Sequence, residues 1–406
     1  MRYPENGQSY DVIVVGAGPA GSMAARSAAE HGLEVLLVER ELEVGVPDKC
    51  GEYLPALKEM RRLAPDALGL ETLFDPPKDC IVNRTKFVKF IFPNLAEYTV
   101  DFKGVVVDRK LYDKHLAYEA GRAGAEILPF TRVIKLLDDG VRVRSGANVF
   151  DLHSKVVIGA DGAYSLIARE AGLPISRNPL DYGVGYQFEM VNVDHDPDYV
   201  DMYLGEDVAP GSYAWIIPKG QDIANVGTGI RAPFIERGMT IRDYQRNFVE
   251  RHPLSSKKLK KAVPTAVKAG FIPVGGPLNK TSTERVIVVG DAGAHTIPTV
   301  GGGVPPGLII GKIAGDVASE YIQNDEPLTD FDSAWRKQMG KVLENSLRMR
   351  KMSDVVFRSK KLMDVITRVD WLTRETLDKF IHCEMDAKMR LIERALQSGE
   401  VRKILQ

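Results

Sequence analysis

The clearest hydrophobic pattern in the chain is a set of short, unbroken apolar runs that each lead into a turn. They occupy residues 12–15, 35–38, 156–158 and 286–289. An apolar run of this length between turn residues is typical of a strand that is buried on both faces, as in a parallel sheet. The pattern therefore predicts a parallel sheet that is assembled from separate parts of the chain.

A second pattern alternates apolar and polar residues and predicts antiparallel strands at 87–92 and 98–102. Residues 181–273 are also strand-like, most clearly at 182–193, 213–218 and 225–231. The fold class that follows is α/β with two lobes: a Rossmann-like domain, an inserted antiparallel-sheet substrate domain and C-terminal helices. We expect the first domain over residues 1–80, 103–175 and 281–334, the second over 81–102 and 176–280, and the helical segment over 335–406.

Composition excludes several classes of function. Lys and Arg number 54 against 55 acidic residues, so no nucleic-acid partner is expected. Three widely spaced cysteines (Cys50, Cys80 and Cys383) argue against a disulfide framework and for a reducing compartment or a catalytic thiol, and no metal-ligand cluster is evident. The start lacks a signal-peptide pattern, and no run of about eighteen apolar residues occurs. We expect a cytoplasmic protein, at most peripheral at the inner membrane face.

Three glycines follow the first apolar run at Rossmann spacing. Gly16 permits a tight turn, Gly18 lets the backbone approach a pyrophosphate, and Gly21 allows close helix-to-strand packing. The next apolar run ends in Glu39, where a ribose hydroxyl needs an acceptor. This context predicts a dinucleotide site, against the alternative of a glycine-rich turn without a ligand.

Further motifs carry a resemblance to a known family. The turn at 16–21, Gly-Ala-Asp-Gly at 159–162 and Gly-Asp at 290–291 resemble the glutathione-reductase-type FAD fold, in its para-hydroxybenzoate hydroxylase-like branch. Cys-Gly-Glu at 50–52, the segment 210–219 and the triple glycine at 301–303 resemble the archaeal geranylgeranyl (digeranylgeranylglycerophospholipid) reductases, which saturate isoprenoid double bonds in membrane lipids. The resemblance covers residues 8–330 and implies FAD rather than NAD. Ile217 stands where the family more often has Phe, which bears on the pocket shape.

The resemblance implies a set of FAD contacts. The amides of residues 18–21, with Ala20 among them, would meet the pyrophosphate, and Glu39 the adenosine ribose. Asp291, at the end of a buried strand, would accept from the ribityl chain. The remaining expected contacts are Lys49, Cys50 and Glu52 in a loop over the flavin, Arg109 against FAD, Val133 beside the adenine, and Gly302, Gly303 and Val304 at the pyrimidine side of the flavin, where oriented amides stabilise negative charge.

The implied reaction needs a hydride from reduced flavin and a proton. Cys50 is one candidate proton donor, because the adjacent Lys49 favours a reactive thiol; the alternative is a small space-filling residue. His295 is the second candidate, although a hydrogen-bonded loop histidine is the simpler interpretation, and ordered water is the third. Arg109 could be a surface arginine, and Asp161 could cap a helix instead of contacting a ligand.

Three residues are candidates for the substrate pocket. Tyr213 and Trp215 lie at alternate positions of a strand and therefore share one face, which lines either an apolar tunnel or a sheet core. Pro218 ends that strand. The partners that follow are an isoprenoid lipid substrate and an external electron donor, either a small redox protein or reduced nicotinamide, because no second Gly-x-Gly-x-x-Gly motif occurs.

Membrane contact is suggested by charge. Residues 335–406 carry 17 Lys or Arg against 10 Asp or Glu at helical intervals, and 257–261 holds four lysines, although solvated faces explain both.

Two other classes of function stay open. Residues 213–218 approach the Trp-x-Trp-x-Ile-Pro pattern of halogenases without its first Trp, so a flavin monooxygenase or halogenase is one alternative. A noncatalytic FAD or lipid carrier is the other.

Overall fold

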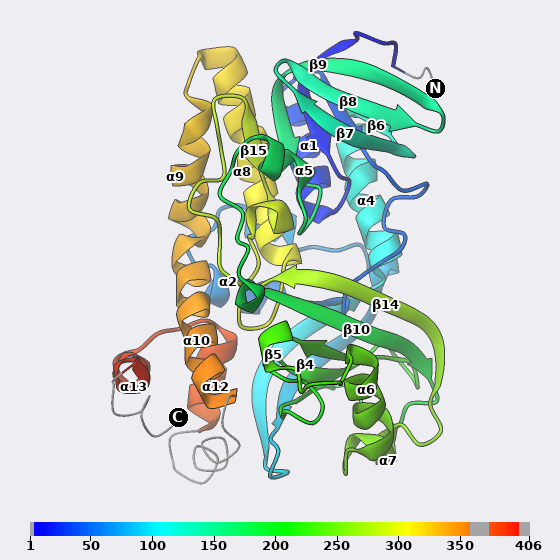
Figure 1. The fold of residues 1–406 in the computed structure, drawn as a ribbon, viewed down its shortest axis with the longest axis vertical. Coiled ribbons are helices and arrows are strands. Elements are labelled where there is room, and N and C mark those ends of the chain that lie inside the picture. The colour runs from blue at the N-terminus through cyan, green and yellow to red at the C-terminus, as the bar shows by residue number, and fades with distance from the viewer. Residues whose placement is uncertain (1–3, 358–372, 398–406) are drawn as a thin grey trace.

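The computed structural model describes residues 4–357 and 373–397 and contains two sheets, each with its own core (Figure 1). The first sheet has the strand order β6-β2-β1-β9-β8-β7, with β15 also paired to β9. Strands β6, β2, β1, β9 and β15 are mutually parallel, whereas β7, β8 and β9 form an antiparallel meander. The bounds are β1 Ser9–Val15, β2 Val35–Val38, β6 Glu126–Leu128, β7 Thr131–Leu137, β8 Gly140–Ser145, β9 Asn148–Gly159 and β15 Val286–Val288.

The apolar run of β1 is buried on both faces, as its pattern predicts. Val12 and Val14 face one hydrophobic cluster with helix α1 (Pro19–Glu30), and Ile13 faces a second cluster across the sheet. Helix α8 (Val304–Asn324) packs against α1 at very short range. A Cβ on Gly311 would lie 2.3 Å from the carbonyl oxygen of Ala20, so glycine is required at this crossing.

The second sheet has the order β14-β10-β13-β12-β11-β4-β5-β3. Its strands pair antiparallel except β11 with β4, where the two inserted parts of the chain meet. The sheet includes β3 and the whole of β5, beyond residue 102 where we expected the domain boundary. The bounds are β3 Tyr53–Pro55, β4 Ile81–Ile91, β5 Glu97–Val107, β10 Tyr182–Val191, β11 Tyr199–Tyr203, β12 Ala214–Pro218, β13 Ala224–Ile230 and β14 Val263–Pro273.

The C-terminal part is helical in the described residues. Helices α9 and α10 form a column beside both lobes in Figure 1, while α12 packs on β5 and α13 on α10. The bounds of the remaining helices are α2 Leu57–Leu63, α3 Leu70–Leu73, α4 Arg109–Arg122, α5 Leu166–Glu170, α6 Ile241–Arg246, α7 Ser255–Lys258, α9 Phe331–Trp335, α10 Lys341–Phe357, α12 Arg374–Ile381 and α13 Ala387–Gln397.

The predicted two-lobed α/β architecture is confirmed. None of the helices in residues 4–357 and 373–397 combines the length and the apolar character needed to cross a bilayer. Part of the basic segment that suggested membrane contact, residues 358–372 and 398–406, lies outside the described residues.

Candidate active site

The turn between β1 and α1 has the geometry that its glycines predict. Gly16 has φ +104°, and a Cβ there would lie 2.4 Å from the carbonyl oxygen of Ala160. A Cβ on Gly21 would lie 1.9 Å from the carbonyl oxygen of Gly16, so the helix packs directly on the turn. A Cβ on Gly18, in contrast, would meet nothing within 4 Å. Gly18 therefore leaves open space above the first turn of α1.

Glu39 lies at the carboxyl end of β2 and is held against this turn. Its Oε2 accepts a hydrogen bond of 2.8 Å from the amide of Ala17, and its Oε1 accepts one of 2.9 Å from the amide of Glu41. Val133 lies on β7, and its side chain is buried in a hydrophobic cluster of the first sheet.

One cavity of about 1220 Å³ joins the two lobes. At one end it is lined by the turn at 18–20, the segment 160–164, Asp291 and the loop 297–305. At the other end its walls are apolar and come from the second sheet and the C-terminal helices. These apolar residues include Phe90, Phe92, Phe102, Met202, Leu204, Met349, Met352, Val356, Leu377, Phe380 and Ile381. The loop 49–55 and Arg109 lie along the same cavity.

The N-terminus of α8 points to the cavity beside Asp291. Gly302, Gly303 and Val304 line the cavity where this helix begins, and a Cβ on Gly303 would lie 3.1 Å from Asp291 Oδ1. The same oxygen accepts a hydrogen bond of 3.2 Å from the Thr296 hydroxyl. Burial raises the pKa of the Asp291 carboxyl. Asp161 also lines the cavity, and it caps α5 by accepting from the amides of Leu166 and Ile167.

Arg109 is the first residue of α4 and is not a surface arginine. Its guanidinium forms two hydrogen bonds of 2.7 and 2.8 Å with the carboxylate of Asp113. Burial alone would lower the pKa of Arg109, but Asp113 and the nearby Cys50 raise it well above its usual value. The guanidinium is thus a fixed positive charge in the cavity wall, close to the Cys50 thiol.

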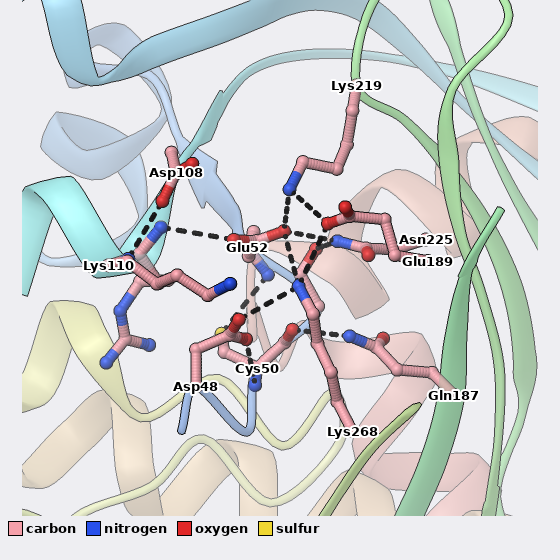
Figure 2. Close-up of polar contacts among 12 residues, drawn as sticks. Asp48, Cys50, Glu52, Asp108, Lys110, Gln187, Glu189, Lys219, Asn225 and Lys268 are labelled. Carbon is pink, nitrogen blue, oxygen red and sulfur yellow. Dashed lines mark hydrogen bonds and ion pairs between the residues drawn. The ribbon is translucent and has the colours of Figure 1, made fainter. Parts of the chain in front are cut away.

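The loop that carries Cys50 is fastened to the second sheet through Glu52, which Figure 2 shows at the centre of a polar cluster. Glu52 is 1% exposed and has φ +67°, a backbone conformation that costs about 1–3 kcal/mol in a non-glycine residue. Its Oε2 lies 2.6 Å from Lys219 Nζ and 3.1 Å from Lys268 Nζ. Asn225 Nδ2 donates to the same oxygen at 2.7 Å, and the amide of Arg109 donates to Oε1 at 3.1 Å.

Two further carboxylates complete this cluster. Glu189 lies 2.7 Å from Lys219 Nζ and 3.3 Å from Lys268 Nζ, and Asp48 lies 3.0 Å from Lys268 Nζ. Burial opposes ionisation of Glu52, yet the two lysines lower its pKa overall. Burial, with Glu52 as the second cause, raises the pKa of Asp48. The loop is therefore fixed chiefly by the ion pairs of Glu52 with the two lysines, which favour the ionised form of this carboxylate.

The predicted alternation of the 213–218 strand brings three side chains to the cavity. Tyr213, Trp215 and Ile217 all line it, whereas Pro218 does not and instead accepts a hydrogen bond from Asn83 through its carbonyl. The Tyr213 hydroxyl donates to the carbonyl of Val300 at 2.6 Å, just before the triple glycine.

Trp215 connects the same strand to the Cys50 loop. Its indole Nε1 donates to Gln187 Oε1 at 2.9 Å, and Gln187 Nε2 donates to the carbonyl of Cys50 at 2.6 Å. Lys49 lines the cavity beside Cys50. It also lies against β14, since a Cβ on Gly270 would be 3.2 Å from the Cβ of Lys49.

His295 lies outside the cavity. Its ring is fully buried, with its centroid 4.7 Å from that of Trp335, and neither ring nitrogen has a hydrogen-bond partner within the described residues. Burial lowers the pKa of His295 to about 3. Its position therefore gives no support to the hypothesis that it delivers a proton.

Sequence reasoning missed the residues that anchor the Cys50 loop. Lys219 ends the segment 210–219, whose pattern indicates no role for it, and the others come from separate strands: Gln187 and Glu189 from β10, Asn225 from β13 and Lys268 from β14. One signal was available for Lys268. It is a lysine at an inward position of an alternating strand, and a buried lysine needs a charged partner.

Comparisons with known proteins agree with this geometry. Residues 181–271 match the geranylgeranyl reductase catalytic domain, and residues 11–45 match the FAD-dependent oxidoreductase family. Curated relatives include digeranylgeranylglycerophospholipid reductase 2 of Methanopyrus kandleri (37% identical over 353 residues, 84% of this chain and 86% of the relative). Another is the digeranylgeranylglycerophospholipid reductase of Methanocaldococcus jannaschii (37% over 355 residues, with the same coverage).

Solved structures place the fold in the same group. A geranylgeranyl bacteriochlorophyll reductase-like protein from Thermoplasma acidophilum superimposes with a TM-score of 0.77 at 30% identity, covering 98% of each chain. A flavin-dependent brominase superimposes with a TM-score of 0.72 at 17% identity, covering 98% of this chain and all of the brominase. The second likeness shows a shared fold alone, so it does not favour the halogenase alternative.

The residues present fit FAD. Gly18 offers open space at the start of a helix where a pyrophosphate would bind, Glu39 is fixed at the end of the next strand, and the N-terminus of α8 faces the cavity. The glycines at 16 and 21 are sterically required for this cradle. The chain therefore belongs to the digeranylgeranylglycerophospholipid reductase family and is an FAD-dependent oxidoreductase.

Proposed function

We propose that this protein saturates the isoprenoid double bonds of geranylgeranyl chains in archaeal membrane glycerophospholipids or their precursors. The observation that carries the proposal is the single cavity, in which the nucleotide cradle, Cys50 and a long apolar wall are continuous. The similarity to the digeranylgeranylglycerophospholipid reductases of Methanopyrus kandleri and Methanocaldococcus jannaschii supports the same substrate class.

The apolar wall suits a hydrocarbon chain. Phe90 and Phe102 come from the second sheet, while Leu377 and Phe380 come from α12, so the chain would lie between sheet and helices. Burying methylene groups there is favourable by about 0.8 kcal/mol each. An unactivated double bond has no carbonyl to polarise, so positioning by such a wall is the main contribution that the protein can make.

FAD, when bound and reduced, supplies the hydride for such a saturation. The residues proposed to hold it are Gly16, Gly18, Ala20, Gly21, Glu39, Lys49, Cys50, Glu52, Arg109, Val133, Asp291, Gly302, Gly303 and Val304. Arg109 and the N-terminus of α8 supply positive potential along the cavity. Tyr213, Trp215 and Ile217 close the cavity on the side of the second sheet.

Cys50 is the proposed proton donor. It is partly buried, lines the cavity and lies between the nucleotide end and the apolar wall. Its backbone carbonyl is fixed by Gln187, and the amide of Glu52, two residues later, donates to its sulfur at 3.2 Å. The Sγ–H would therefore deliver its proton to the second carbon of the double bond from a fixed position.

The electrons and the substrate both come from outside the chain. We propose an external donor, a small redox protein or reduced nicotinamide, and a peripheral contact with the membrane that contains the lipid.

The test is anaerobic. The bound flavin is reduced by light, a geranylgeranyl phospholipid in detergent is added, and flavin absorbance and lipid mass are followed. Reoxidation with a gain of two hydrogens per double bond is expected. A flavin that stays reduced would overturn the proposal. In a separate aerobic assay, oxygen uptake coupled to an aromatic substrate would favour a monooxygenase or halogenase.

A further inference from the structure

The second sheet ends at a free edge strand, β14, whose outer face is apolar. Val263, Val267 and Phe271 are 52%, 61% and 49% exposed, and Tyr164 beside them is 66% exposed. The Tyr164 ring packs edge-on against Phe271 with centroids 4.8 Å apart. Four large apolar side chains exposed in one region exceed the scattered single residues that are normal on a surface.

The neighbouring strand β10 extends this face. Across these two strands, Val184 lies opposite Phe271, Tyr186 opposite Ala269, and Phe188 opposite Val267. Between them these residues form an aromatic and aliphatic surface. Phe188 itself packs against the hydrophobic cluster around Phe248, so the strand-edge patch is defined here as Tyr164, Tyr186, Val267 and Phe271. In Figure 1, β14 and β10 cross the front of the molecule below the first sheet.

The two faces of these strands have different partners. Lys268 and Gln187 point inward to the Cys50 loop, as Figure 2 shows, so the inner face of both strands is committed to the active site. Tyr186, Val267 and Phe271 lie on the other face, as the alternation of a strand requires, whereas a register shift after Glu189 places Val263 opposite Val191 on the face of Lys268. Its apolar character is therefore not explained by packing around the Cys50 loop.

The patch reaches the mouth of the cavity. Tyr164, Val184 and Phe271 line the cavity as well as the outer surface. Ile272 and Trp215, on either side of Gly185, continue the apolar lining from Phe271 along the second sheet toward the apolar wall. This continuity is the first argument for what occupies the patch.

Positive charge borders the same strand. Lys257, Lys260 and Lys261 immediately precede β14 and are exposed, and within the described part of the chain no carboxylate lies within 4 Å of their ammonium groups. Lys258, in contrast, is paired with Asp201. Lysines beside exposed aromatic and aliphatic side chains are the arrangement that binds an anionic bilayer surface.

We infer that the strand-edge patch and these three lysines are the surface by which the protein docks on an anionic lipid bilayer, with the mouth of the cavity facing the membrane. The inference rests on the proposed function, because it is a lipid substrate that must enter from the bilayer. It assigns the membrane contact to β14 rather than to the basic C-terminal segment.

The test is co-sedimentation of the FAD-loaded protein with vesicles of phosphatidylcholine alone and of phosphatidylcholine with phosphatidylglycerol. The parent is expected to sediment more with the anionic vesicles. The double variant Tyr186→Ser/Val267→Ser, whose residues lie outside the cavity lining, is expected to lower the partition coefficient roughly tenfold, the loss that follows from removing two partly inserted side chains. Lys260→Glu/Lys261→Glu is expected to remove the preference for anionic lipid.

Matched controls lie on the first sheet. Val149→Ser replaces a comparably exposed valine, and Arg132→Glu/Lys135→Glu reverses two exposed charges on β7; both are expected to sediment like the parent. Flavin absorbance checks that each variant is folded.

Four outcomes would overturn the inference: a parent that does not bind vesicles, patch variants that bind like the parent, controls that lose binding equally, or a patch variant that changes only the molar mass in solution. The last would assign the patch to a second copy of the chain. None of these readouts involves turnover, so they are independent of the reductase test in detergent.

Discussion

The indole of Trp215 holds Gln187, which in turn holds the backbone of Cys50. The two hydrogen bonds, 2.9 Å from Trp215 Nε1 to Gln187 Oε1 and 2.6 Å from Gln187 Nε2 to the Cys50 carbonyl, join the cavity wall to the loop that carries the proposed proton donor. Trp215, an aromatic residue of the cavity wall, thus also fixes the position of Cys50, which lies on a loop distant in the sequence.

Trp215→Phe is expected to impair the reaction more than its effect on stability suggests. The substitution leaves Gln187 Oε1 buried without a donor, which costs about 1–3 kcal/mol, and frees the Cys50 carbonyl to shift. Single-turnover flavin reoxidation and urea unfolding measure the two effects. Trp335→Phe is the matched control, because Trp335 also donates its indole N–H, to Thr281, but lies outside the cavity lining. Equal rates for the two variants would contradict the positioning role.

Cys50→Ala is expected to slow lipid-dependent flavin reoxidation by about 100-fold, the usual contribution of a positioned acid, with FAD content unchanged. Cys50→Ser should retain part of the rate, because its hydroxyl is a weaker acid in the same place. Cys80→Ala removes a buried cysteine from the core instead and should lower stability without changing the rate. A Cys50→Ala protein with the parent rate would eliminate the cysteine as proton donor.

Lys219→Met is expected to destabilise the fold by about 3–5 kcal/mol, since it removes one cation from between Glu52 and Glu189 and leaves buried negative charge uncompensated. Urea unfolding near neutral pH measures the loss. Lys86→Met breaks the ion pair with Asp198 on an exposed part of the same sheet, and little change is expected there. A Lys219 variant as stable as the Lys86 variant would show that Lys268 and Asn225 suffice to hold Glu52.

The sequence predicts the nucleotide turn well because its requirements are local. The residues at 16 and 21 must be glycine for steric reasons that act within a few residues and one neighbouring strand. The alternation of Tyr213 and Trp215 likewise follows from strand geometry alone. The two-sheet architecture follows from two patterns. Unbroken apolar runs indicate strands buried on both faces, and alternating apolar and polar residues indicate half-buried strands.

The anchoring cluster is not predictable in the same way. Lys219, Asn225 and Lys268 meet at Glu52 only because β12, β13, β10 and β14 adopt one particular order and register, which no single segment specifies. Similarly, the spacing of Leu377 and Phe380 indicates an amphipathic helix but not that its apolar side faces the cavity. His295 shows the reverse error, since its place within a motif suggested chemistry while its ring belongs to the core beside Trp335.

Gly18→Ala and Gly21→Ala are expected to separate cofactor binding from folding. A Cβ at 18 meets open space, so the apoprotein should unfold at nearly the parent urea concentration, while FAD binds roughly tenfold more weakly because the methyl group occupies the approach of the pyrophosphate. A Cβ at 21 lies 1.9 Å from a backbone oxygen, so Gly21→Ala should lower the stability of the apoprotein itself by about 1–3 kcal/mol. Flavin titration and urea unfolding test both. Unchanged FAD affinity in Gly18→Ala would place the pyrophosphate elsewhere.

His295→Leu is expected to flatten the dependence of stability on pH. The pKa of the buried ring is lowered to about 3, below its unfolded value of about 6.5, so the unfolded chain takes up a proton that the folded protein refuses. The contribution of His295 is therefore constant above about pH 7.5 and becomes progressively unfavourable as the pH falls toward 3, amounting to about 2 kcal/mol at pH 5. Between pH 7.5 and pH 5 the free energy of unfolding of the parent should fall by about 2 kcal/mol more than that of the variant, as measured by urea unfolding at both pH values. The reoxidation rate should be unchanged. A variant that keeps the full pH dependence would mean that His295 is protonated in the folded state, and a variant that loses the reaction would return it to the list of proton donors.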